Sequence, residues 1–171
     1  QFMEDRIGLS QSLELDISLP PGTTFEDPET LAKLSELSGR LLQIPELTQS
    51  TSALTLMERV NRLLHDDDPA YERTGDSRAA NAELLEILSF DNPETLGRWL
   101  SLDRSRFRIS FDSVVLAHSE HERILARVEN LISTHLPSNW SVAQSGGVTM
   151  SHTWVRDVQA TQLRSFPVAF A

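Results

Sequence analysis

Hydrophobic and polar residues alternate at several places along the chain, and each alternation predicts a strand with one buried face. The pattern is clear over Ser12–Leu19 and over Arg106–Phe111, and it predicts a further strand over Trp140–Ser145. A weaker alternation over Leu47–Ser50 predicts one more short strand. Together these segments predict a small sheet.

Between the strands, apolar residues recur at spacings of three and four, which predicts amphipathic helices. Asp27-Pro28-Glu29 and Asn92-Pro93-Glu94 have the residue types typical of a helix start, and Pro45 ends the first helix. The helices are expected over 28–44, 54–64, 78–88, 93–99, 119–136 and from about 149 onward. Their inward residues are expected to be Leu31, Leu34, Leu37 and Leu41; Leu56, Val60, Leu63 and Leu64; Ala80, Leu84, Ile87 and Leu88; and Leu125, Val128, Leu131 and Ile132.

The order of these elements predicts an α+β protein with a split β-α-β (ferredoxin-like) arrangement and an inserted helical segment. Helices are expected on one face of a small mixed sheet, in a single domain over 1–171. Residues 65–77 are polar and predict an exposed acidic loop. The segment 148–171 predicts an exit helix with an apolar end. That end either docks on the domain's own core or opens a transmembrane helix.

Composition narrows the class of protein without giving its function. The chain has 171 residues, 15 basic and 25 acidic side chains, and a formal net charge of −10. This balance argues against nucleic acid as a partner, because phosphate backbones require a surface rich in Lys and Arg. Cysteine is absent, which excludes disulfides and thiolate chemistry. The sequence contains no run of about 20 apolar residues, so it predicts no complete membrane span.

Candidate metal and catalytic sites are weak. His118 and His121 lie three apart on a predicted helix, but Ser119 with Glu122 is better explained as a capping box that leaves both imidazoles outside. Asp66-Asp67-Asp68 lacks the staggered ligands and turn glycine of a calcium loop. Gly146-Gly147 lacks the lysine and hydroxyl of a phosphate loop and predicts a turn. We therefore expect no catalytic residue, metal or cofactor.

Several segments taken in order resemble one family. The strand Leu13–Ile17, followed by the Asp27-Pro28-Glu29 helix start, resembles the opening of extracytoplasmic loops in exporters of the resistance–nodulation–division (RND) superfamily, most closely the MMPL-like, hopanoid-associated branch. Ser145-Gly146-Gly147 and Ser165-Phe166 are similar to the exit of such a loop into the next membrane span. Residues between them also match the pattern: Ile44, Pro45, Glu46, Leu47, Ser52, Leu56, Asn61, and Gln159 or Gln162. The chain departs from it at Ser50, where the family has an apolar residue, and at Thr55, where it has an acid.

The resemblance implies a porter domain on the periplasmic side of the inner membrane, attached to the rest of a proton-driven transporter. It implies no bond-breaking chemistry and a hydrophobic or amphiphilic substrate, lipids included. Both chain ends should then lie close together, and an apolar cleft should exist, for which Phe90, Trp99 and Leu100 are candidates. The alternatives are a free-standing ligand-binding module or small enzyme of the same fold, and a surface that docks a partner protein.

Overall fold

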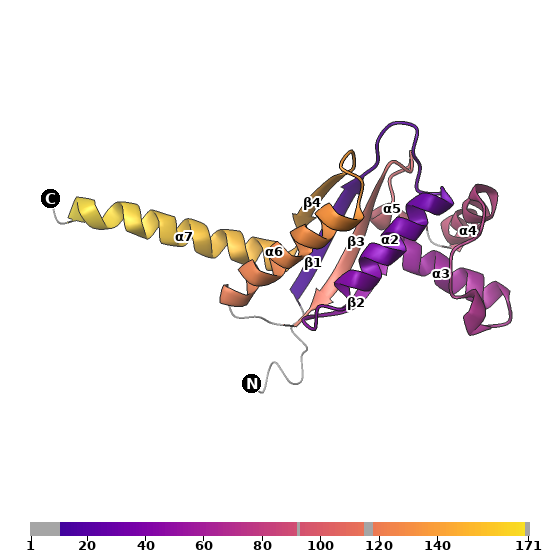
Figure 1. Ribbon diagram of the computed structural model, residues 1–171, viewed down its shortest axis with the longest axis horizontal. Helices are drawn as coiled ribbons and strands as arrows, with labels where there is room; N and C mark the ends of the chain where they lie inside the picture. The colour runs from indigo at the N-terminus through magenta and orange to yellow at the C-terminus, as the bar shows by residue number, and fades with distance from the viewer. Residues whose placement is uncertain (1–10, 92, 115–117, 170–171) are drawn as a thin grey trace.

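The computed structural model describes residues 11–91, 93–114 and 118–169, so the predicted cap at Asn92 and the terminal Phe170 and Ala171 lie outside the described residues. The strands in this part are β1 (Gln11–Ser18), β2 (Leu47–Ser52), β3 (Arg106–Ser113) and β4 (Ser141–Ser145). The helices are α2 (Pro28–Leu41), α3 (Ala53–Leu64), the 3-10 helix η1 (Pro69–Tyr71), α4 (Arg78–Asp91), α5 (Pro93–Trp99), α6 (His118–His135) and α7 (Gly147–Ala169). The protein is therefore α+β, as predicted (Figure 1).

The strands form one sheet in the order β2-β3-β1-β4. Every neighbouring pair is antiparallel, so the prediction of a mixed sheet was wrong. The physical reason is that β3 lies between β1 and β2, and it separates the two strands that run in the same direction. The register pairs Leu15 with Ile109 and Ile17 with Phe107, which places the apolar residues of the two central strands on one face.

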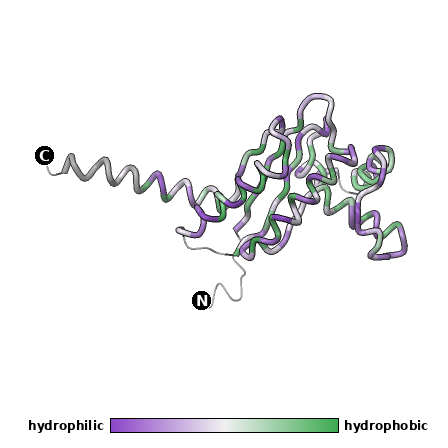
Figure 2. The backbone as a smooth tube through the Cα atoms, in the orientation of Figure 1, coloured by the Kyte–Doolittle hydropathy of each residue, from purple (hydrophilic) through white to green (hydrophobic). Residues whose placement is uncertain are grey.

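This apolar face of the sheet is covered by α2 and α6, which lie over the same side of the strands (Figure 1). The predicted inward leucines of α2 are all fully buried there. Hydrophobic and hydrophilic residues alternate along the strands (Figure 2), so each strand supplies one side chain in two to the core. The buried strand residues are Leu13, Leu15, Ile17, Phe107, Ile109 and Phe111.

Helix α3 buries a different face from the predicted one. Ala53, Leu54 and Met57 are buried, whereas Leu63 and Leu64 are 59% and 57% exposed. The helix follows β2 without a linker, so its first turn meets the sheet and its last turn extends beyond the core. Its start is a capping box: the Thr55 hydroxyl accepts a hydrogen bond from Ser52 N at 3.0 Å, and Ser52 Oγ accepts one from Thr55 N at 3.3 Å.

Helix α4 is attached to the body through a buried polar side chain. Asn81 is fully buried, and its Nδ2 donates to the carbonyl oxygen of Glu26 at 2.9 Å. Its Oδ1 accepts a hydrogen bond from the backbone N–H of Gly75 at 2.8 Å. The carboxylate of Glu26, itself buried, forms ion pairs with Arg78 and Arg104. Helix α4 is therefore fixed to the segment between β1 and α2 by a hydrogen bond and an ion pair, and its Leu84 and Leu85 are buried in the core.

Helix α6 corrects two predictions. It begins at His118, so Ser119 lies inside the helix and not at its cap. His121 is only 3% exposed, although it was predicted to lie outside, because it shares a helical face with buried Ile124 and Val128. Its Nε2 lies 3.1 Å from Oε1 of Gln11 on β1.

The chain enters and leaves the sheet at one place. Glu14 pairs with Ser145 in the β1–β4 ladder, and Gly146 follows with a φ of +92°. A Cβ at Gly146 would lie 2.5 Å from the carbonyl oxygen of Ser12, so the backbones are in close contact. From there α7 projects away from the body (Figure 1). Within the described residues, none of the helices is long and apolar enough to cross a membrane.

Candidate functional site

The second face of the sheet is polar and carries the candidate site. On the two central strands the outward residues are charged or hydroxylated, because they alternate with the buried core positions. These outward residues are Ser12, Glu14, Asp16 and Ser18 on β1, and Arg106, Arg108, Ser110 and Asp112 on β3. On β4 the residues paired with Glu14, Asp16 and Ser18 are Ser145, Ala143 and Ser141.

A groove of about 780 Å³ lies on this face, where the end of α5 meets the strands. Its volume is within the range of about 300–1,000 Å³ that is usual for small-molecule sites. One wall is the segment Gly97–Ser101, and the floor is formed by outward residues of β1, β3 and β4. The wall is held to β3 by a bridge between Leu100 and Phe107. The groove therefore joins segments that are far apart in the sequence.

The floor of the groove holds a cross-strand charge cluster. Nε of Arg108 donates to Oδ1 of Asp16 at 2.7 Å, and its guanidinium lies 3.5 Å from a carboxylate oxygen of Glu14. The second oxygen of Asp16 accepts a hydrogen bond from Oγ of Ser145 at 3.0 Å. The hydrogen bond to Asp16 raises the pKa of Arg108 above its ordinary value. These groups satisfy one another, so the cluster supports the sheet as well as lining the groove.

One end of the groove is fixed by a compact loop. Asp103 accepts hydrogen bonds from the hydroxyls of Ser101 and Ser105, at 2.6 Å and 2.8 Å. These bonds lower the pKa of Asp103 to about 2. Ser101 in turn accepts a hydrogen bond from the backbone N–H of Arg106 at 3.0 Å. The loop therefore holds the start of β3 against the end of α5.

Two arginines at this end have exposed side chains, and the charge of one of them, Arg106, helps to lower the pKa of Asp103. Arg98 and Arg106 are exposed, and in the part of the chain that the structure describes neither forms an ion pair. Trp99, the next residue after Arg98, is half-buried and packs against the core. The groove has three arginines against two carboxylates in its lining, in a chain whose net charge is −10.

Two of the three residues expected to line an apolar cleft lie in the groove, and the third does not. Trp99 and Leu100 line the groove, but Phe90 does not and is 89% exposed. The groove is amphiphilic in composition and not the apolar cleft that was expected. The difference arises because its floor is the polar face of the strands, which alternation placed opposite the core.

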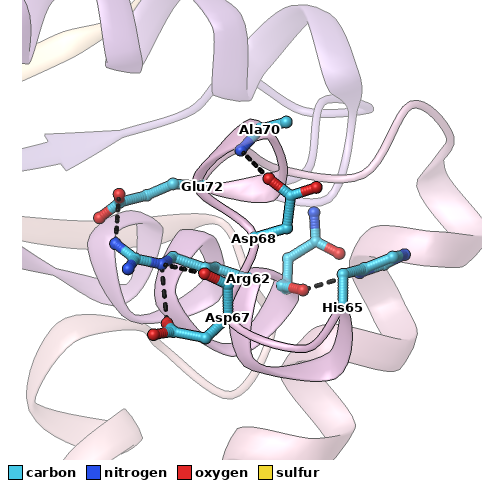
Figure 3. A network of polar contacts seen from close by, with 7 residues as sticks. Arg62, His65, Asp67, Asp68, Ala70 and Glu72 are labelled. Carbon is cyan, nitrogen blue, oxygen red and sulfur yellow. Dashed lines mark hydrogen bonds and ion pairs between the residues drawn. The ribbon is translucent and has the colours of Figure 1, made fainter.

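A second polar cluster lies at the end of α3 (Figure 3). Arg62 forms ion pairs with Asp67 at 2.8 Å and with Glu72 at 3.0 Å. Asn61 donates to the carbonyl oxygens of Tyr71 and Arg73 at 3.1 Å and 2.7 Å. These contacts fold the hydrophilic segment 65–73 (Figure 2) back onto the helix.

The acidic run Asp66-Asp67-Asp68 belongs to this turn. Asp66 and Asp67 have positive φ values of 55° and 63°. Asp68 caps η1 by accepting a hydrogen bond from Ala70 N at 2.9 Å. The ring of His65 stacks on that of Tyr71 with centroids 3.7 Å apart. Among the described residues no group of three or more metal-ligating side chains is present, at this turn or near His121.

Glu58 on α3 gives a prediction about pH. Burial, with a smaller contribution from the charge of Glu72, raises the pKa of Glu58 to about 7. The folded chain therefore binds this proton more tightly than the unfolded chain. The stability of the folded chain is fully present below the ordinary pKa of a glutamate, where Glu58 is protonated in both states, and part of it is lost as the pH rises to about 7 and Glu58 ionises. Urea unfolding of Glu58→Gln should show a gain over the natural chain on the order of 1 kcal/mol at about pH 8 and none at about pH 4, the figure being reduced for partial exposure.

The matched control is Glu83→Gln, which removes an exposed carboxylate from α4. We expect its difference from the natural chain to be the same at both pH values. A Glu58→Gln difference that does not change with pH would contradict the assignment.

No family model, curated protein or solved structure matches this chain.

Proposed function

We propose that this chain is the extracytoplasmic domain of an RND-type, proton-driven exporter, located on the periplasmic side of the inner membrane. It guides a hydrophobic or amphiphilic substrate, lipids included, and breaks no bond. The proton-carrying groups belong to the membrane part of the transporter. The sequence resemblance suggests this function, and three features of the structure support it.

The first feature is the topology. A split β-α-β (ferredoxin-like) arrangement requires two β-α-β units whose strands interleave in one antiparallel sheet. Helix α2 connects β1 to β2, α6 connects β3 to β4, and the sheet order is β2-β3-β1-β4. Helices α3, α4 and α5 lie between β2 and β3 in the sequence, where an insertion is expected. This order supports the proposed porter fold.

The second feature carries the proposal: both connections of the domain leave from the same place. The beginning of α7 lies against the beginning of β1, with Gly147 Cβ, if present, 3.6 Å from Cβ of Gln11. A domain inserted between two membrane helices needs this proximity, because both of its connections must reach one membrane surface. The two ends of the chain, which were expected from the sequence to lie close together, are outside the described residues, so the support comes from the starts of β1 and α7 alone.

The third feature is α7 itself. Its 23 residues correspond to about 35 Å of helix at about 1.5 Å per residue. Only its first turns approach the body, and the rest projects outward (Figure 1). A projecting helix of this kind is suited to connect a domain to a membrane segment.

A labelling experiment on the full-length gene product tests the location. This chain contains no cysteine, so Ala70→Cys at the exposed tip of the α3 turn introduces its one addressable thiol, and any cysteine in the rest of the full-length product is replaced by serine beforehand. We expect a membrane-impermeant maleimide to label it in intact spheroplasts, and the protein to sediment with membranes. Leu34→Cys, which is fully buried, is the control and should react only after denaturation. Labelling of Ala70→Cys only after lysis would exclude the proposed location.

The groove favours a second candidate, a free-standing ligand-binding module of the same fold. It brings polar groups from three strands and α5 together around a half-buried tryptophan, as a small-molecule site does. The labelling experiment also distinguishes the two candidate functions. A free-standing module would remain in the soluble fraction, whereas an exporter domain would sediment with membranes.

A further inference from the structure

The groove on the polar face of the sheet contains two exposed cationic side chains, Arg98 and Arg106, and the charge of Arg106 also acts on Asp103. Arg108 is engaged by Asp16 and Glu14, whereas Arg98 and Arg106 form no ion pair with any residue that the structure describes. An exposed guanidinium offers several N–H donors in a planar arrangement that matches a phosphate or a carboxylate. Both arginines line the same groove and therefore offer it N–H donors for an anionic group.

The positions of these arginines are fixed by structure on both sides. Arg98 is the residue before Trp99, at the end of α5, which is bridged to β3 through Leu100. The backbone of Arg106 is held in both directions, because its N–H donates to Ser101 Oγ and its carbonyl oxygen accepts from Ser101 N at 2.8 Å. A site whose backbone is fixed before binding loses less conformational entropy when a ligand binds.

The groove also has an apolar component beside the two cations. Trp99 and Ala143 belong to its lining, and Trp99 is half-buried, so one part of its surface is accessible. An aromatic side chain of this kind can cover an alkyl chain or a ring. The carboxylates on the floor, Asp16 and Glu14, repel an anion, so it is expected at the end of the groove where Arg98 and Arg106 lie.

We propose that this groove binds the anionic headgroup of an amphiphile, with Arg98 and Arg106 on the phosphate or carboxylate and Trp99 on the adjoining apolar part. The site specifies the substrate class of the proposed exporter and in that respect rests on the proposed function. The binding itself can be measured on the chain alone, so its outcome is independent of where the protein is located.

The test is a calorimetric titration of the chain with octyl phosphate below its micelle concentration. Inorganic phosphate supplies the anion without the alkyl chain, and octyl glucoside supplies the alkyl chain without the anion. We expect octyl phosphate to bind at least tenfold more tightly than either. Arg98→Ala/Arg106→Ala should weaken octyl phosphate binding at least tenfold, and Trp99→Phe should weaken it while leaving the affinity for inorganic phosphate unchanged.

The matched control is Arg59→Ala/Arg127→Ala, which removes two exposed arginines from α3 and α6 and changes the net charge equally. It should leave the affinity within about twofold, and circular dichroism should show all variants folded. Equal binding of octyl phosphate and octyl glucoside, or equal weakening by the control pair, overturns the proposal. Binding of inorganic phosphate as tight as that of octyl phosphate overturns it too, because the ligand would then be a free anion. If octyl phosphate does not bind but the maleimide labels the full-length protein as expected, the groove is rejected as a binding site and the proposed function is unaffected.

Discussion

Replacing Gly146 by alanine should lower the free energy of unfolding by about 2–4 kcal/mol. Two separate costs contribute to this loss. The residue has a φ of +92°, which an L-residue with a Cβ adopts only with strain. The added Cβ would also lie 2.5 Å from the carbonyl oxygen of Ser12, so the β1 backbone or the start of α7 must move. Urea unfolding followed by circular dichroism measures the effect.

Two other glycines separate these costs. Gly22 has a φ of +86° but open space around the position of a Cβ, so Gly22→Ala should lose only about 1 kcal/mol. Gly39 is in the interior of α2 with nothing near its Cβ position, so Gly39→Ala should gain about 0.5–1 kcal/mol. If Gly146→Ala costs no more than Gly22→Ala, the close contact between β1 and α7 is not maintained in solution. The proposed proximity of the two connections would then lose its support.

Replacing Asn81 by alanine should cost about 2–4 kcal/mol and release α4 from the body. The side chain satisfies the backbone N–H of Gly75 and the backbone carbonyl of Glu26, and it is fully buried. Alanine would leave both backbone groups without their partner in a site that excludes water. Hydrogen exchange should therefore increase in α4 and in residues 72–77 more than in α2.

The control for Asn81 is Asn130→Ala on α6. Asn130 is exposed, and alanine has the higher helix propensity, so this variant should be neutral or slightly stabilising. If Asn81→Ala lowers stability no more than Asn130→Ala, the hydrogen bonds of Asn81 do not hold the inserted helix. Equal exchange rates in α4 and α2 would lead to the same conclusion.

Much of the fold could be predicted because alternation and helical spacing report burial directly. The strands β1 and β3 and the apolar face of α2 follow from residues that are either fully buried or outward-facing. The pattern failed where polar residues are buried. Asn81 and His121 lie in the core, but no periodicity of apolar residues includes them. It also failed at Leu63 and Leu64, because the spacing of α3 does not show where the sheet ends.

The candidate groove was harder to predict, since its residues come from three strands and the end of α5. The outward charges of β1 and β3 were visible in the sequence as the polar half of each alternation, but their pairing depends on the register. Arg108 meets Asp16 only because the two strands are adjacent and antiparallel. Thr55 contributes its hydroxyl to the capping box of α3.

The adjacency of the two connections has a mechanical consequence. Strand β4 is an edge strand and pairs with β1 over five residues, from Glu14–Ser145 to Ser18–Ser141. Its last residue lies near the beginning of β1, so a force that separates α7 from the segment before β1 acts across the ladder and not along it. Such a force loads the hydrogen bonds one pair at a time, beginning at Ser145. The edge of the sheet can therefore be peeled open in steps by a pull on α7, while β1, β3 and β2 stay joined.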